Sequence, residues 1–189
     1  NIAADAVAKA TDDHTLGVVI NGNLTSAKML YPQLPFDPAK DFSYLSLLTT
    51  APLVLVAPAN LPGGKAFFDA ARQSGDRWNY GSPGTGTLAH LGMELLVSKL
   101  PGMAPTHIPF QGNPQVVTGL LGAQIHMALV PPGLAMPQVA AGKLRAIGLA
   151  GSRSALVPDV PSLAEAGVRG VNLEVWTALV GPARLSQAA

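Results

Sequence analysis

The stretch YGSPGTGTLAHLGMELL, residues 80–96, decides the fold of this chain. It leaves a short predicted strand at 78–80, crosses a loop with three glycines, and enters a helix expected over 88–100. The helix is indicated by Leu88, Leu91, Leu95 and Leu96, whose spacing places them on one face. A strand, a glycine loop and a helix in that order are typical of an α/β protein.

The same alternation continues on both sides of this stretch. The irregular segment 31–42 carries three prolines, and Pro52 predicts a break inside the apolar run 45–57. Further strands are expected over 15–20, 106–110, 124–130, 144–150 and 173–180. Further helices are expected up to residue 10 and over 65–73, 114–122, 137–142 and 161–167. Together these elements predict an α/β fold with a mainly parallel sheet.

The composition excludes several classes of function. Only 12% of the 189 residues are charged, against about 25% in an average protein, and the net charge is +1 without any basic run. We therefore expect no nucleic-acid partner. The absence of cysteine excludes disulfides, thiolate catalysis and cysteine-ligated zinc. The apolar runs are too short for a membrane-spanning helix, so we do not expect a membrane-embedded protein.

The glycine loop, residues 81–87 (GSPGTGT), is the sharpest local feature. Its glycines allow a tight turn and close approach of a ligand to the main chain, and Ser82, Thr85 and Thr87 add hydroxyls. The N–H groups at the start of the following helix suit an anion such as a carboxylate. The alternative is a plain turn in which Thr85 or Thr87 caps the helix. Neither a Walker motif nor G-x-G-x-x-G is present.

Other groups of residues are weaker candidates for a site. Ser82 with a histidine such as His90 would suit a hydrolase or transferase, but the G-x-S-x-G motif is absent. The four histidines show no metal-binding spacing, so we expect no metal and no cofactor. The turn at Gly112 and Asn113 also joins a strand to a helix. It can present main-chain amides to a ligand, or it can equally be a simple connection.

Four runs of the chain resemble one family, the periplasmic solute receptors of tripartite tricarboxylate transporters (the Bug family). The first is the opening stretch; the others are HIPFQGNPQVVTGLLGAQIHMAL at 107–129, AAGKLRAIGLAGSRSALVPDVPSLAEAGV at 140–168 and EVWTALVGPA at 174–183. The most specific segments are GKLRA at 142–146 and PDVPSLAEAG at 158–167. The resemblance extends over almost the whole chain.

The resemblance implies a two-lobed type II periplasmic binding protein (a Venus flytrap) with mainly parallel sheets. Lobe 1 would hold 1–56 and 169–189, and lobe 2 would hold 57–168. It also implies a non-enzymatic periplasmic receptor that binds a small carboxylate in the cleft between the lobes and delivers it to the membrane components of a transporter. The residues implied in ligand binding are Ser82, Gly84, Thr85, Gly86, Thr87, Gly112, Asn113, Asn21, Gly22 and Asn23, with His90 as a support.

Three departures from the family pattern affect the expected ligand. Val130 replaces a common aspartate, which favours a plain carboxylate over an amino acid, and His14 replaces a tyrosine. The family's first carboxylate-binding loop and its C-terminal helices have no counterpart here, so we expect a piece of a longer protein that binds weakly. A hydrolase using Ser82 and a receptor-like scaffold without a ligand remain the alternatives.

Overall fold

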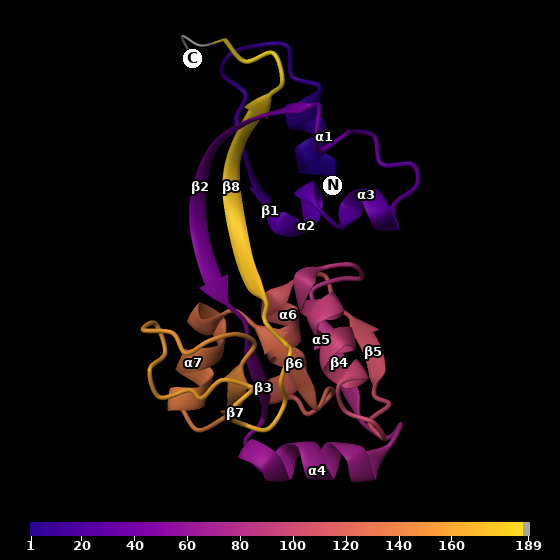
Figure 1. The fold of residues 1–189 in the computed structure, drawn as a ribbon, viewed down its shortest axis with the longest axis vertical. Coiled ribbons are helices and arrows are strands. Elements are labelled where there is room, and N and C mark those ends of the chain that lie inside the picture. The colour runs from indigo at the N-terminus through magenta and orange to yellow at the C-terminus, as the bar shows by residue number, and fades with distance from the viewer. Residues whose placement is uncertain (187–189) are drawn as a thin grey trace. The chain divides into compact units, whose positions relative to one another are not determined.

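The computed structural model describes residues 1–186 and divides the chain into two compact units (Figure 1). Unit 1 comprises Asn1–Thr50 and Val175–Ala189, and unit 2 comprises Ala51–Glu174. The chain therefore passes from one unit to the other twice. The lobe bounds expected from the sequence, 1–56 with 169–189 and 57–168, stay a prediction, and residues 187–189 of that range lie outside the described part.

Unit 1 is built on a three-stranded sheet in the order β1-β8-β2, in which β1 and β8 are antiparallel. A small apolar core that includes Val7, Val19, Phe36 and Val180 packs beneath it. Phe36 and Phe42 meet edge to face, with ring centroids 5.5 Å apart. The elements of this unit are α1 (Ile2–Ala8), β1 (Gly17–Ile20), α2 (Asn21–Leu24), α3 (Ala27–Leu30), β2 (Phe42–Pro52) and β8 (Glu174–Pro182).

Unit 2 contains a five-stranded sheet in the order β5-β4-β6-β3-β7. Strands β5, β4 and β6 are parallel, and β3 is antiparallel to both β6 and β7, so four of the five strands share one direction. The elements are β3 (Val54–Pro58), α4 (Gly64–Ser74), β4 (Asn79–Ser82), α5 (Leu88–Ser98), β5 (Thr106–Pro109), α6 (Asn113–Leu121), β6 (Met127–Val130), α7 (Pro132–Ala140) and β7 (Leu144–Leu149). The mixed α/β fold with a mainly parallel sheet is thus confirmed in this unit.

The core of unit 2 follows from the hydrophobic pattern. All five residues of β3 are buried, as an unbroken apolar run predicts for a strand paired on both sides. Helices α5 and α6 contact β4 and β6 (Figure 1). Packing is tight at Gly81, where an added Cβ would lie 2.4 Å from Ile125 Cδ1 and 3.1 Å from Phe110 Cε2. The break expected at Pro52 is present, since β2 ends at Pro52 and β3 begins at Val54.

Two local predictions were wrong. The helix expected over 137–142 is α7, which already begins at Pro132 and ends at Ala140. A proline in the first turn loses no helical hydrogen bond, so it suits that place. No helix forms over 161–167. Instead, Ser162 and Glu165 exchange hydrogen bonds across one turn, which ends at Gly167 with φ +103.

Candidate functional site

The site lies at the edge of the unit 2 sheet where β4, β5 and β6 end. Because these strands are parallel, their carboxyl ends meet at one edge. The glycine loop leaves β4 there, and the segment 110–113 leaves β5 beside it. The Phe110 amide donates a 2.8 Å hydrogen bond to the Ser82 carbonyl oxygen, which joins the two segments. The structure therefore brings the first and second predicted loops together.

Two hydroxyls of the glycine loop are engaged inside the loop. Ser82 is fully buried, and its Oγ lies 2.7 Å from His107 Nε2 and 3.1 Å from the Gly84 carbonyl oxygen. Thr87 Oγ1 donates to the same carbonyl at 2.8 Å and accepts the His90 amide at 3.4 Å, so Thr87 caps α5. Among the three predicted hydroxyls, only that of Thr85 belongs to an exposed residue.

The backbone of the glycine loop needs two of its glycines. Gly84 has φ +141 and Gly86 has φ +81, conformations that residues with a side chain rarely adopt. The Gly86 amide donates to His90 Nδ1 at 3.1 Å. His90, predicted as a support, thus contacts the loop through one defined atom. Its other ring nitrogen, Nε2, lies 3.9 Å from Glu94 Oε1.

His107 is a residue that the sequence reasoning missed. Its ring stacks on His90 with centroids 4.0 Å apart and on Tyr80 at 4.9 Å. Burial, and then the neighbouring His90, lower the pKa of His107. Burial and a short hydrogen bond to the Glu94 carboxylate raise the pKa of Tyr80. The only signal in the sequence was a histidine in the strand after the loop, and it becomes informative only once the strand register is known.

The remaining predicted residues have less direct roles. Asn113 begins α6, and its buried Oδ1 has no hydrogen-bond partner within the described residues, while Gly112 caps the same helix in an extended conformation. Val130 is fully buried and pairs with Val54 in the sheet. It presents no charge to the edge where β6 ends.

Asn21, Gly22 and Asn23 belong to unit 1, at the end of β1. Asn21 is buried, and its Oδ1 accepts the Gly22 amide at 3.1 Å. Asn23 Oδ1 accepts the Ile20 amide at 3.3 Å, and Asn23 Nδ2 donates to Asn1 Oδ1 at 3.0 Å. These side chains therefore hold the start of α2 in place.

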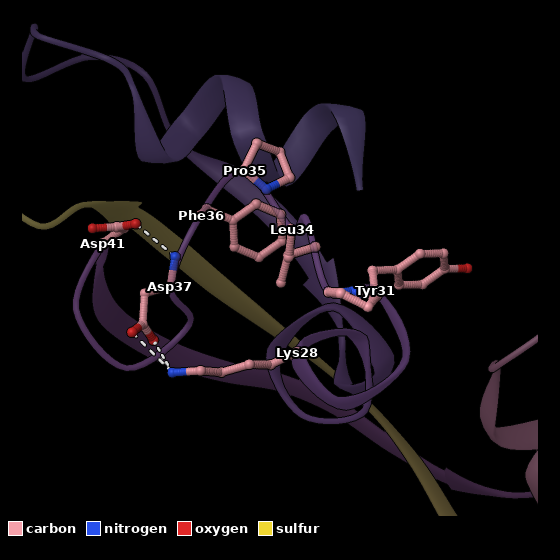
Figure 2. Close-up of a pocket in the computed structure, with 8 residues that line it drawn as sticks. Lys28, Tyr31, Leu34, Pro35, Phe36, Asp37 and Asp41 are labelled. Atoms are coloured by element: carbon pink, nitrogen blue, oxygen red, sulfur yellow. Dashed lines mark hydrogen bonds and ion pairs between the residues drawn. The ribbon is translucent and has the colours of Figure 1, made fainter.

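A hollow of about 430 Å³ lies in unit 1 around the proline-rich segment (Figure 2). Its lysine, Lys28, binds both carboxylate oxygens of Asp37 at 2.9 Å. The Asp37 amide in turn donates to Asp41 at 2.6 Å. The hydrogen bond from Lys28 lowers the pKa of Asp37. Because this cation is already paired with a carboxylate of the protein, the hollow is a weaker candidate for an anion than the glycine loop.

The geometry around Ser82 does not favour an enzyme that uses a serine and a histidine. Ser82 Oγ contacts His107 rather than His90, and no carboxylate hydrogen-bonds to His107 within residues 1–186. A fully buried hydroxyl is poorly placed to attack a substrate. In the same described range, no group of three or more histidine, aspartate or glutamate residues could hold a metal ion, and no helix is long and apolar enough to cross a bilayer.

Comparison with known proteins gives one consistent result. The family model for the tripartite tricarboxylate transporter family receptor matches residues 1–188. A UPF0065 protein of Bordetella pertussis is 32% identical over 96% of this chain and 57% of its own length. The chain thus spans just over half of that relative.

Two solved structures from Rhodopseudomonas palustris are similar in fold and sequence. MatC with bound malate superposes with a TM-score of 0.87 at 32% identity, over 99% of this chain and 65% of its own. A second protein, solved with adipate, gives 0.93 at 25% identity, over 99% of this chain and 64% of its own. Both bound molecules are dicarboxylates.

Proposed function

The chain belongs to the tripartite tricarboxylate transporter receptor family, and from that premise we propose that it binds a small organic carboxylate, with the glycine loop as its main contact. The observation that carries the proposal is the N-terminus of α5, where the amides of Leu88 and Ala89 come too early in the helix to reach an acceptor within it. Such groups, together with the helix dipole, stabilise a bound anion. The neighbouring amides of Gly84, Gly86, Thr87 and His90 already donate inside the loop and fix its shape. Malate in MatC and adipate in the second relative support the ligand class.

Fixed neutral donors explain how a weakly charged chain can hold an anion. The loop is anchored by Ser82 below and by Thr87 at the helix cap, so its amides need not reorganise when a ligand arrives. In this proposal Gly84 and Gly86 allow close approach, and Thr85 donates its hydroxyl to the ligand. Ser82 and Thr87 act through loop shape. Gly112 and Asn113 belong to the neighbouring edge of the same site.

The wider assignments follow from the family and are part of the proposal. We propose a periplasmic receptor that hands its ligand to the membrane components of a tripartite transporter, with Asn21–Asn23 as the contribution of the other lobe. The lobe bounds 1–56 with 169–189 and 57–168, and a cleft between these lobes, remain predictions. Val130, in place of a common aspartate, favours a plain mono- or dicarboxylate.

A carboxylate screen with a matched pair of variants tests the proposal. Thermal unfolding is recorded with malate, adipate and related acids, and affinity is then measured by calorimetry. We expect at least one acid to raise the unfolding temperature, and Thr85→Val to weaken its binding. Thr118→Val, at an exposed threonine whose hydroxyl only bonds the Pro114 carbonyl, should leave the affinity unchanged.

Three outcomes would contradict the proposal. Chemical turnover of the stabilising acid would favour the serine–histidine enzyme. The lack of any stabilising acid would favour a scaffold without a ligand. Equal affinity in Thr85→Val and the parent chain would show that the loop hydroxyl is not a ligand contact.

A further inference from the structure

We propose that His107 is a positioning residue of the glycine loop, acting with His90, and that the pair holds the loop in one conformation only while His90 is neutral. The expected effect of the pair on ligand affinity rests on the proposed function. The expected effect on the conformation of the loop does not depend on a ligand. The two histidines come from different elements, His90 from α5 and His107 from β5.

The pair contacts the glycine loop at both ends. His107 Nε2 lies 2.7 Å from Ser82 Oγ, where the loop leaves β4. His90 Nδ1 accepts the Gly86 amide at 3.1 Å, just before α5 begins. Because the rings stack with centroids 4.0 Å apart and 25° between their planes, the two contacts are linked to each other. The loop between them is therefore fixed from both sides.

The proton positions follow from these contacts. His90 Nδ1 accepts a hydrogen bond, so it carries no proton, and the proton of the neutral ring lies on Nε2 toward Glu94. If His107 Nε2–H donates to Ser82 Oγ, the hydroxyl remains free to donate to the Gly84 carbonyl at 3.1 Å. Ser82 Oγ also accepts the Gly84 amide at 3.3 Å. This arrangement satisfies all three contacts of the hydroxyl.

Protonation of His90 removes one end of the attachment. A proton on Nδ1 turns the acceptor into a donor, so the hydrogen bond from the Gly86 N–H to His90 is lost and the N–H faces a cation. The groups that face the pair are Tyr80 from β4, Glu94 on α5 and each histidine itself. Glu94 accepts the Tyr80 hydroxyl, its Oε1 lies 3.9 Å from His90 Nε2, and the His107 ring stacks on His90. Two stacked imidazolium rings would repel each other, and burial lowers the pKa of His107.

The test first reads the loop without any ligand. Amide and imidazole ¹⁵N signals are followed from pH 8 to pH 5.5. In the parent chain the Gly86 amide signal should shift with the same midpoint as the His90 ring. In His90→Asn, whose amide oxygen can replace Nδ1 but does not titrate, the Gly86 signal should stay constant. The control is His126→Gln, another half-buried histidine, which bonds Asn79 at the start of β4 and should leave the Gly86 titration unchanged.

Variants of His107 separate positioning from mere packing. His107→Phe keeps an aromatic ring for the stack but cannot bond Ser82, so the loop signals should broaden at pH 8. His107→Gln, whose amide N–H can take the place of Nε2–H, should restore them. A Gly86 signal that does not follow His90, or a loop spectrum unchanged in His107→Phe, would overturn the inference.

The ligand arm uses malate and adipate as probes. The affinity of the parent chain should fall by about 2- to 10-fold relative to His90→Asn between pH 8 and pH 5.5, the range expected for one hydrogen bond. Comparing the two proteins at each pH cancels protonation of the acid itself. If the loop signals behave as expected but neither acid binds, the proposed function fails and the role of the pair in loop order stands. Binding with a parallel pH dependence in both proteins would refute the pair's effect on affinity.

Discussion

Ser82→Ala is the substitution whose cost can be worked out most directly from the structure. It removes a hydroxyl from a residue with no exposed surface and leaves His107 Nε2 without its 2.7 Å partner. The Gly84 carbonyl keeps its two bonds from Thr87, so the groups left unsatisfied are the imidazole nitrogen and the Gly84 amide, which donates to the hydroxyl at 3.3 Å. An uncompensated buried polar group costs about 1–3 kcal/mol. For a protein of this length that corresponds to a fall in Tm of about 2–12 °C.

The assay is urea unfolding at pH 8 in a Trp176→Phe background, so that Trp78 fluorescence reports on unit 2. The matched control is Ser74→Ala, a buried serine whose hydroxyl makes a single 2.7 Å bond to the Ala71 carbonyl at the end of α4. It should cost only about 0.5–1.5 kcal/mol, the usual net value of one hydrogen bond. A loss in Ser82→Ala no greater than in Ser74→Ala would refute the reasoning that this hydroxyl anchors the loop.

Three further predictions concern packing and pH. Gly81→Ala should lower the unfolding free energy by about 1–3 kcal/mol, because its methyl group would overlap buried side chains. The control Gly133→Ala, with open space around it in α7, should be neutral or slightly stabilising, and equal effects of the two variants in urea unfolding would contradict this. Because the folded state lowers the pKa of His107, unfolded chains bind its proton first, so stability should fall as pH drops below about 6.5, and the fall should be smaller in His107→Gln. No such difference in unfolding between pH 8 and pH 5 would argue against a neutral, partly buried ring. The hydrogen bond from Arg153 lowers the pKa of Glu165 to about 2, so the contribution of Glu165 to stability is present above about pH 4.5 and lost as pH falls toward 2. The stability of Glu165→Gln should therefore depend less on acid pH, and an acid unfolding profile identical to that of the parent chain would count against the pair.

Much of the fold could be predicted because the hydrophobic periodicity of short segments indicates which of them form helices and which form strands. The leucine spacing after the glycine loop gives α5, the apolar run after Pro52 gives β3, and the three-proline segment stays irregular. Predictions failed where a short segment could satisfy its backbone in two ways. The segment 161–167 has a helix-like start at Ser162 and Glu165, but it joins the edge of β7 through bonds between Leu149 and its neighbours instead.

The candidate site was predicted in its backbone but not in its side chains. Glycines and hydroxyls at the start of a helix indicate where an anion can bind, whatever the rest of the fold does. That Ser82 is a buried anchor rather than an exposed donor depends on a histidine 25 residues later in the chain. Local pattern carries no information about such a contact.

The sequence by itself determined the order of helices and strands, the glycine loop and the family to which the chain belongs, because periodicity, turn chemistry and motif are local properties. Only the tertiary structure decided which side chains meet beneath the loop. The parallel register of β4 and β5 places His107 opposite Tyr80, and Ser82, two residues farther along β4, faces the same side. A shift of one residue in that register would have turned His107 to the other face of the sheet and left the loop without its second histidine.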